Sequence, residues 1–250
     1  MRKVNLIPMA GLGQRFIDEG YTIPKPLIEI NGLPMCVKAA RCLPSADKWI
    51  FICKKEHIEL MRIDEVLRNF FPGATIISID YTTNGQASTC LIARELLNKD
   101  DILTIGACDN GMSYSHSVFK NKIKNNDAII WTFRNNKSVL KNPSMYGWAD
   151  VHDDGHATRI SCKKPISNSP MKDHALVGTF TFKRAEHFFK YTERVIKKNL
   201  RINNEFYLDI VLSECINDNL KVIPLEVETY NGWGTPSDLL KYLEQEFYKK

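Results

Sequence analysis

The stretch VNLIPMAGLGQRF, residues 4–16, decides the expected fold. Its apolar run at 4–9 predicts a short buried strand, and the glycines after it predict a turn into a loop. Glycines at a strand end let the backbone approach phosphate groups and present its N–H groups as donors. We therefore expect a phosphate-contacting loop at 10–13, with Arg15 gripping phosphate oxygens through its planar guanidinium.

Short apolar strands alternate with helical spacings in the first half of the chain. This alternation is typical of βαβ units and a largely parallel sheet. The predicted strands here are 4–9, 49–53, 74–79 and 101–105, and the helices are 33–43, 56–70 and 87–97. After about residue 127 strands dominate, at 128–133, 146–152, 157–162, 176–182 and 220–227, with helices at 184–198, 206–217 and 236–247.

We predict one Rossmann-like α/β domain over residues 1–250, with a mixed, mainly parallel central sheet and helices on both sides. About 1–127 would form a nucleotide-binding half, and about 128–250 the acceptor side of a cleft. Ligands of open α/β sheets lie beyond the carboxyl ends of strands, so chemistry is expected after Met9, Ile79 and Ile105.

Composition narrows the class of protein. The net charge of +5 is mild and there is no long basic run, which argues against nucleic acid as a partner. No apolar run approaches the roughly 20 residues of a membrane span, so we expect no membrane partner. Seven cysteines without a C-x-x-C pair indicate a reducing compartment, hence a cytoplasmic location, without disulfides or a zinc site. An oligomer remains open.

Lys25 lies between two prolines in IPKPL, residues 23–27. Prolines restrict the backbone on both sides, which limits the entropy lost when the lysine binds phosphate. A plain glycine turn beside unrelated basic residues is the alternative. The dinucleotide-binding fingerprint is excluded, because Phe16 stands where its third glycine would be.

Together these stretches resemble the signature of the nucleotidyltransferases that make activated sugars and related phosphate esters, (A/G)-G-x-G-x-R followed by P-K-P-L. Further segments match the family in order: GQAST at 85–89, IGACDN at 105–110, SCKKP at 161–165 and GTPSDL at 234–239. The resemblance covers nearly the whole chain, although each motif alone is short. It implies the nucleotidyltransferase fold, which is GT-A-like.

The resemblance also implies roles for individual residues. The implied catalytic residues are Arg15 and Lys25 on the triphosphate and Asp109 on a catalytic Mg²⁺ or Mn²⁺. Lys164 and Glu205 are implied to bind the acceptor. The implied nucleotide-binding residues are Met9, Ala10, Gly11, Leu12, Gly13, Gly85, Gln86, Ala87 and Ser88.

The chain departs from the family pattern at two positions. Gly232 stands where a second metal-binding aspartate is usual, and Glu226, Glu228, Asn231 or a water are the open substitutes. Lys163 stands where a glutamate usually precedes the lysine. Simpler interpretations remain open for three features. Asp109 could fix a turn, the lysine pair could be a solvated edge, and Asn203 or Asn204 could cap a helix.

The implied reaction is an in-line attack by an acceptor phosphate oxygen on the α-phosphorus of an NTP, releasing pyrophosphate. A phosphate is already ionised at neutral pH, so no general base is needed, and catalysis is positioning plus charge neutralisation. The short form of this family, in which these motifs are combined with GWGTP as at 232–236 here, is most similar to the CTP:phosphoglutamine cytidylyltransferases of bacterial capsule phosphoramidate synthesis. That similarity implies CTP and L-glutamine phosphate as partners.

Other functions remain open at this point. The acceptor could be a sugar 1-phosphate or a phosphocholine-type molecule. A glycosyltransferase of the related fold would use 109–111 as a degenerate D-x-D, but it needs no triphosphate grip by Arg15 and Lys25. A non-catalytic nucleotide sensor would bind nucleotide without turnover.

Overall fold

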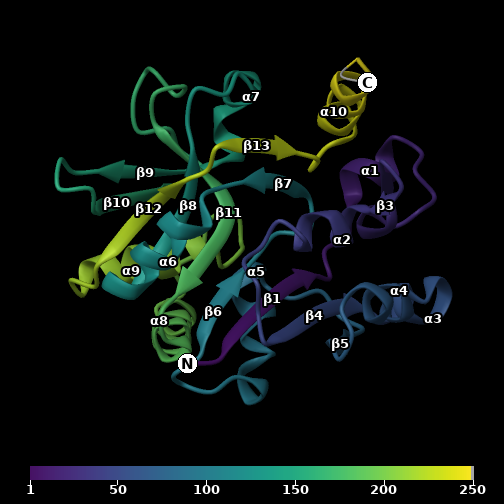
Figure 1. Cartoon of the computed structure of the whole chain (residues 1–250), viewed down its shortest axis with the longest axis horizontal. Helices are drawn as coiled ribbons and strands as arrows, with labels where there is room; N and C mark the ends of the chain where they lie inside the picture. Colours follow the sequence, from purple (N-terminus) through teal and green to yellow (C-terminus); the bar gives the residue numbers. More distant parts are fainter. Residues whose placement is uncertain (249–250) are drawn as a thin grey trace.

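A nine-stranded sheet forms the centre of the protein in the computed structural model, which describes residues 1–248 (Figure 1). Its main run is, in order, β5 (Thr75–Ile79), β4 (Lys48–Lys54), β1 (Lys3–Met9), β6 (Ile102–Ile105), β11 (His174–Phe182), β8 (Ala128–Phe133) and β12 (Val222–Glu226). Strand β11 is antiparallel to both of its neighbours, whereas the other pairings in this run are parallel. The predicted α/β architecture with a mixed, mainly parallel sheet is therefore confirmed.

Strand β1 lies between β4 and β6, with Leu6 opposite Ile50 on one side and Ile105 on the other. Leu6 and Ile7 point to opposite faces of the sheet, and both are fully buried. A continuous apolar run is what a parallel strand covered on both faces requires. Because β1, β4 and β6 are parallel, their carboxyl ends meet at one edge of the sheet.

Helices cover both faces of the sheet, as predicted. The face that carries Leu6 packs against α5 (Gln86–Leu91), α8 (Ala185–Lys197) and α9 (Leu208–Asn217). The face that carries Ile7 packs against α2 (Met35–Ala40), α4 (Ile63–Phe70) and α6 (His116–Asn125). The other helices are α1 (Gln14–Asp18), α3 (Lys55–Met61), α7 (Ser138–Lys141) and α10 (Pro236–Phe247).

Short strand pairs and turns complete the fold. Strand β7 (Asn110–Ser113) pairs with β13 (Thr229–Gly232), and β2 (Glu29–Ile30) pairs with β3 (Leu33–Pro34). A hairpin of β9 (Gly147–Val151) and β10 (Ala157–Cys162) lies beside the start of β11. Single 3₁₀ turns occur at Lys25–Leu27, Arg94–Leu96 and Pro143–Met145.

Three predicted helices differ from the observed elements. The helix expected at 56–70 is divided at Arg62, whose φ of +52° is left-handed and separates α3 from α4. The helix expected at 87–97 ends at Leu91 and continues as a 3₁₀ turn. The helix expected at 33–43 is confined to α2, because Leu33 and Pro34 pair as a strand.

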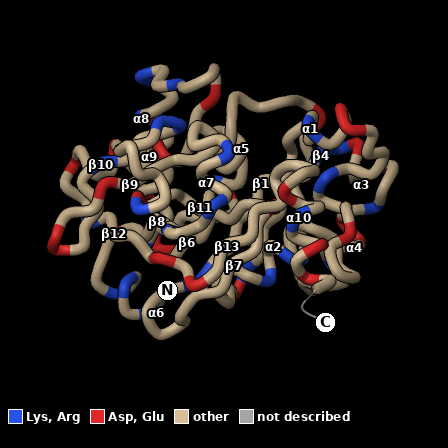
Figure 2. Tube along the Cα trace, turned by 90° about the horizontal axis from the view of Figure 1, so that it is seen from above, with Lys and Arg blue, Asp and Glu red and all other residues tan. Residues whose placement is uncertain are grey.

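Charged side chains are spread over the molecule. Figure 2 shows Lys and Arg interspersed with Asp and Glu along most of the trace, which agrees with the small net charge. Within residues 1–248, no helix combines the length and the apolar character that crossing a membrane would require.

Candidate functional site

Two adjoining cavities lie at the carboxyl ends of β1 and β6. The first has a volume of about 450 Å³ and the second about 260 Å³, and both are lined by Arg15, Gln86 and Gly234. These shared residues make the two cavities parts of one cleft. The cleft is where the chain continues past Met9 and Ile105, as the sheet topology predicts.

The loop after β1 forms one wall of the first cavity. Residues 10–16 all line it, and Lys25 lies beside them. Gly13 has a φ of +68°, and a Cβ there would lie 3.3 Å from Lys25 Cβ. Glycine at this position therefore allows both the left-handed turn and the close approach of the lysine stem.

The opposite wall comes from the segment that opens α5. Gly85 has a φ of +110°, and a Cβ there would lie 2.6 Å from Phe206 N. The Phe206 backbone accepts a hydrogen bond from Ala87 N at 3.0 Å and donates one to Asn84 O at 2.7 Å. The 84–87 loop is thus held against the chain that precedes α9. This contact brings Glu205 to the same cavity as Gln86.

Lys25 and Asp109 form an ion pair between the two cavities. Lys25 Nζ donates a hydrogen bond to Asp109 Oδ2, and the side chains are 18% and 27% exposed. Burial raises the pKa of Asp109, but the charges of Lys25 and Arg15 outweigh it and leave that pKa below its ordinary value. Burial lowers the pKa of Lys25, and Asp109 more than compensates for it. Both groups are therefore charged at neutral pH.

The β7–β13 ribbon fixes the position of Asp109. Trp233 N donates a hydrogen bond to Asp109 O at 2.8 Å, and a Cβ at Gly234 would lie 3.3 Å from Asp109 Oδ2. A Cβ at Gly111 would lie 2.7 Å from the Trp233 ring. Trp233 and Gly234 are therefore packed closely against Asp109.

Gly232 lines the second cavity together with Asp109. It pairs with Asn110 across the β7–β13 ribbon. The position where the family pattern supplies a second aspartate is therefore at the site, but here it carries no side chain. A Cβ there would lie 3.3 Å from the Tyr230 hydroxyl.

Lys163 reaches the second cavity, whereas Lys164 is exposed and lies outside the lining of both cavities. Lys163 has a left-handed φ of +61°. Its Nζ donates a hydrogen bond to Met145 O at 2.6 Å and lies 5.4 Å from the centre of the Tyr207 ring. Of the two adjacent lysines, Lys163 is therefore the one that lines the cleft, whereas the lysine predicted to bind the acceptor was Lys164.

Asp209, at the start of α9, places a buried carboxyl in the second cavity. It is 8% exposed, and a Cβ at Gly147 would lie 2.2 Å from Asp209 Oδ2. Burial raises the pKa of Asp209, and the nearby Lys163 charge only partly offsets this rise. The aspartate ends the NEFYLD stretch at 204–209, in which only Glu205 was predicted to bind a substrate.

The other predicted residues have varied positions. Ala10, Gly11, Leu12 and Gly13 line the first cavity, and so does Glu205, which was predicted to bind the acceptor. Met9 and Ala87 are buried beneath the cleft, and Ser88 Oγ donates a hydrogen bond to Gly85 O at 3.0 Å. Lining residues for which the sequence predicted no individual role include Thr82, Thr83, Thr89, Tyr146, Tyr207 and Asp238.

The Asp109 carboxylate suits a divalent cation whose other ligands are phosphate oxygens of a bound substrate and water. Residues 1–248 contain no group of three or more His, Cys, Asp or Glu side chains arranged around a cation. Mg²⁺ is commonly bound through one or two carboxylates, with phosphate oxygens and water completing its shell. A single aspartate beside cavities that can hold phosphate groups meets that requirement, whereas a cation held by protein alone would need more ligands.

Comparison with known proteins gives a clear structural result. No protein-family profile and no curated protein sequence matches the chain. The nucleoside-diphosphate-sugar pyrophosphorylase from Vibrio cholerae RC9 is 19% identical with a TM-score of 0.78, covering 96% of this chain and 100% of its own. The inositol-1-phosphate CTP transferase from T. maritima is 12% identical with a TM-score of 0.74, covering 97% and 94%.

A third similar structure contains a bound nucleotide. The UTP-bound UGPase from Acinetobacter baumannii is 16% identical with a TM-score of 0.75, covering 100% of this chain and 95% of its own. Identities this low show a common fold. The chain therefore has, along nearly its whole length, the fold that these pyrophosphorylases and the CTP transferase share.

Proposed function

We propose that the protein is a nucleotidylyltransferase, which transfers a nucleoside monophosphate from an NTP to a phosphorylated small molecule and releases pyrophosphate. The observation that carries this proposal is the meeting of the 10–13 loop, Arg15, Lys25 and Asp109 in one cleft at the strand ends. The shared fold supports it, since solved proteins with that fold include a CTP transferase and a UTP-bound enzyme.

The triphosphate would occupy the first cavity. Backbone N–H groups of the 10–13 loop and the Arg15 guanidinium would bind its oxygens, because planar guanidinium groups suit phosphate. Gln86 and Thr83, on the opposite wall, would face the base or the ribose. Lys25 would leave Asp109 and neutralise charge that develops on the departing pyrophosphate.

Asp109 would hold Mg²⁺ or Mn²⁺ together with phosphate oxygens. A bound cation of this kind supplies charge neutralisation on the triphosphate. Without substrate, the Lys25 ammonium compensates the Asp109 charge. When substrate binds, Lys25 would therefore pair with phosphate and Asp109 with the cation. Both charges are then compensated with and without substrate.

The acceptor would bind in the second cavity, with Lys163 near its phosphate. One acceptor phosphate oxygen attacks the α-phosphorus, a new P–O bond forms, and the α–β bridging P–O bond breaks to release pyrophosphate. The attacking oxygen is already ionised, so the residues of the cleft need only orient it and stabilise charge.

We further propose CTP and L-glutamine phosphate as the substrates. The GWGTP segment and the short IPKPL motif support this choice through the resemblance described above. The second cavity adds the Asp209 carboxyl beside Lys163, which suits an acceptor with hydrogen-bond donors besides its phosphate. Sugar 1-phosphates and phosphocholine are the competing acceptors.

Pyrophosphate release tests this function. Each of the four NTPs is combined, with Mg²⁺ or Mn²⁺, with L-glutamine phosphate, phosphocholine, glucose 1-phosphate or mannose 1-phosphate. We expect release with CTP and L-glutamine phosphate, and loss of it in Asp109→Ala and Lys25→Ala. Lys164→Ala is the matched control, because this exposed lysine lies outside the cleft. Nucleotide binding without turnover of any pair, or transfer from a nucleotide sugar, would contradict the proposal.

A further inference from the structure

A separate cavity of about 450 Å³ lies between α6 and the amino-terminal ends of β1 and β6. Helix α6 packs over β8 and β12, and the cavity lies between this helix and the start of β1 and β6 on the same face. The residues that line this cavity, called the α6 cavity below, come from one side of α6, from the starts of β1 and β6, and from the segments around residues 44 and 183. It shares none of them with the cleft.

The interior of the α6 cavity is apolar with a small polar floor. Phe119 and Ile123 are each 7% exposed and face it from one side of α6. Asn5 and Thr104 lie opposite each other on β1 and β6, and each is 2% exposed. Apolar walls with a few fixed polar groups, at a volume within roughly 300–1,000 Å³, are the usual features of small-molecule sites.

The polar floor is held in place by its own hydrogen bonds. Asn5 Nδ2 donates to Pro44 O at 2.7 Å, and Thr104 Oγ1 lies 3.0 Å from Thr181 Oγ1. Trp131 Nε1 also donates to Thr181 Oγ1 at 3.0 Å. These bonds fix the positions of the polar side chains in the floor.

The rim of the α6 cavity is basic. Lys3, Lys120, Lys124 and Lys183 line it, and none of the lining residues is acidic. In the part of the chain from 1 to 248, Lys3, Lys120 and Lys124 take part in no ion pair of 4 Å or less. Lys183 Nζ donates to Lys124 O at 2.6 Å, which holds the rim together at one corner. Four positive charges around an apolar cavity create a potential that favours an anion.

We propose that the α6 cavity binds an amphipathic anion, whose apolar body packs on Phe119 and Ile123 and whose acidic head lies among the rim lysines. This occupant follows from the two properties of the lining. Apolar walls gain from burying a hydrocarbon or aromatic body, and unpaired lysines gain from an acidic group. A neutral or cationic ligand with the same apolar body would pack against the walls but would not pair with the rim lysines.

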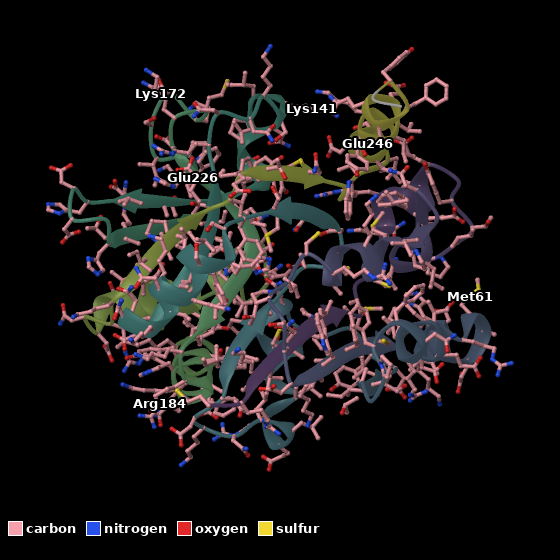
Figure 3. The ribbon with its side chains drawn as sticks, in the orientation of Figure 1. Met61, Lys141, Lys172, Arg184, Glu226 and Glu246 are labelled. Carbon is pink, nitrogen blue, oxygen red and sulfur yellow. The ribbon has the colours of Figure 1, made fainter. Side chains whose placement is uncertain are left out.

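The test uses 1-anilinonaphthalene-8-sulfonate, an aromatic sulfonate whose fluorescence rises in apolar surroundings. The full-length wild type is compared with Lys120→Gln/Lys124→Gln. We expect the double variant to raise the apparent Kd by about fivefold, because it removes two charges that attract the sulfonate. The matched control is Lys172→Gln/Lys197→Gln, which removes the same charge elsewhere. Figure 3 shows Lys172 pointing away from the protein.

Competition defines the ligand class. Decanoate and decyl phosphate are expected to displace the dye, whereas decanol and decyltrimethylammonium are not. CTP with Mg²⁺ is expected to leave the dye bound, because the cleft has a separate lining. Thermal unfolding of each variant confirms that the dye reports a folded protein. The activity of Lys120→Gln/Lys124→Gln is expected to remain near that of the wild type when no amphiphile is present.

Several outcomes would overturn the proposal. One is equal dye binding by the two double variants. Another is displacement by CTP, which would place the dye in the cleft. Equal competition by decanol would show an apolar site without anion preference. Binding to phosphatidylglycerol vesicles without displacement by decanoate would mean a membrane-contacting surface instead.

Discussion

At the scale of single residues, the Lys25–Asp109 pair determines how the cleft responds to ligands. In Lys25→Met, Asp109 keeps its carboxylate but loses the ammonium that donates to it. We expect the unpaired carboxylate to bind Mn²⁺ in the absence of nucleotide more tightly than in the wild type. Electron paramagnetic resonance of free Mn²⁺ measures this directly. Catalysis is expected to fall by about 10²–10³-fold, the usual effect of removing one group that stabilises transition-state charge.

Lys54→Met is the control for the Lys25 experiment, because it removes a lysine from the surface pair with Glu56. It is expected to change neither Mn²⁺ binding nor turnover. Mn²⁺ affinity that is identical in Lys25→Met and the wild type would show that Lys25 does not limit access to Asp109.

The buried Asp209 carboxyl should make the stability of the protein depend on pH. Its pKa is raised by burial in the folded protein, so the folded protein holds this proton to higher pH than the unfolded chain does. The contribution to stability is fully present below the ordinary Asp pKa of about 3.9 and is lost as pH rises through the folded pKa. Asp209→Asn cannot ionise and escapes this loss. Urea unfolding should therefore show that the free energy of unfolding of the variant rises relative to that of the wild type between about pH 4 and pH 8.

If Asp209→Asn and the wild type differed in unfolding free energy by the same amount at about pH 4 and about pH 8, the raised pKa of Asp209 would be contradicted. The comparison with Asp173→Asn controls for general effects of charge, because Asp173 bonds to the exposed Ser167.

These residue-scale features were hard to predict from sequence. An aspartate in NEFYLD carries no sign of burial, and a lysine pair does not show which member a left-handed turn will place in the cavity.

At the scale of elements, the loop that opens α5 depends on glycine at position 85. In Gly85→Ala the new methyl would meet Phe206 N at 2.6 Å, and the φ of +110° is one that side chains disfavour. We expect a loss of about 2–4 kcal/mol in the free energy of unfolding, from strain and forced displacement together. Chemical denaturation measures it.

Gly155→Ala separates the two contributions at Gly85. Gly155 has a comparable φ of +87°, but a methyl group added there would have no neighbouring atom within 4 Å. Backbone strain alone should cost about 1 kcal/mol there. Equal losses at both glycines would mean that the contact with the segment before α9 contributes nothing.

The elements with strong apolar patterns were predictable, and those with weak patterns were not. The strand at 157–162 and the helix at 236–247 agree with β10 and α10. Helix α6 was missed because its sequence HSVFKNKIKN has only three strongly apolar positions among lysines and asparagines. Strand β7, with the sequence NGMS, has no alternation to recognise, and its pairing with β13 joins residues more than 110 positions apart.

At the scale of the whole molecule, substrate should stabilise the fold because both halves of the chain line the cleft. A ligand at 100 times its Kd adds about 2.7 kcal/mol to the free energy of unfolding. We expect CTP with Mg²⁺ to raise the Tm of the wild type more than CTP alone does. In Asp109→Ala the additional rise from Mg²⁺ should disappear. Persistence of that rise would show that Asp109 is not the residue that holds the cation.

The architecture as a whole was largely predictable from the alternation of strands and helices, but the strand order was not. Hydrophobic patterns identify which residues are buried, and they do not state which strand pairs with which. The position of β11 between β6 and β8 results from long-range pairing, with Phe180 opposite Ile105 on one side and Ile130 on the other. The cleft likewise depends on this pairing, because it brings residues 205–209 next to residues 85–109.

Strand β11 also constrains the order of events during synthesis. Strands β6 and β8 emerge from the ribosome before it, yet each pairs with it instead of with the other. Until residues 174–182 have been made, both strands expose an unpaired edge, and such edges are prone to association with other chains. A nascent chain stalled near residue 170 should therefore be more susceptible to proteases than one stalled past residue 230.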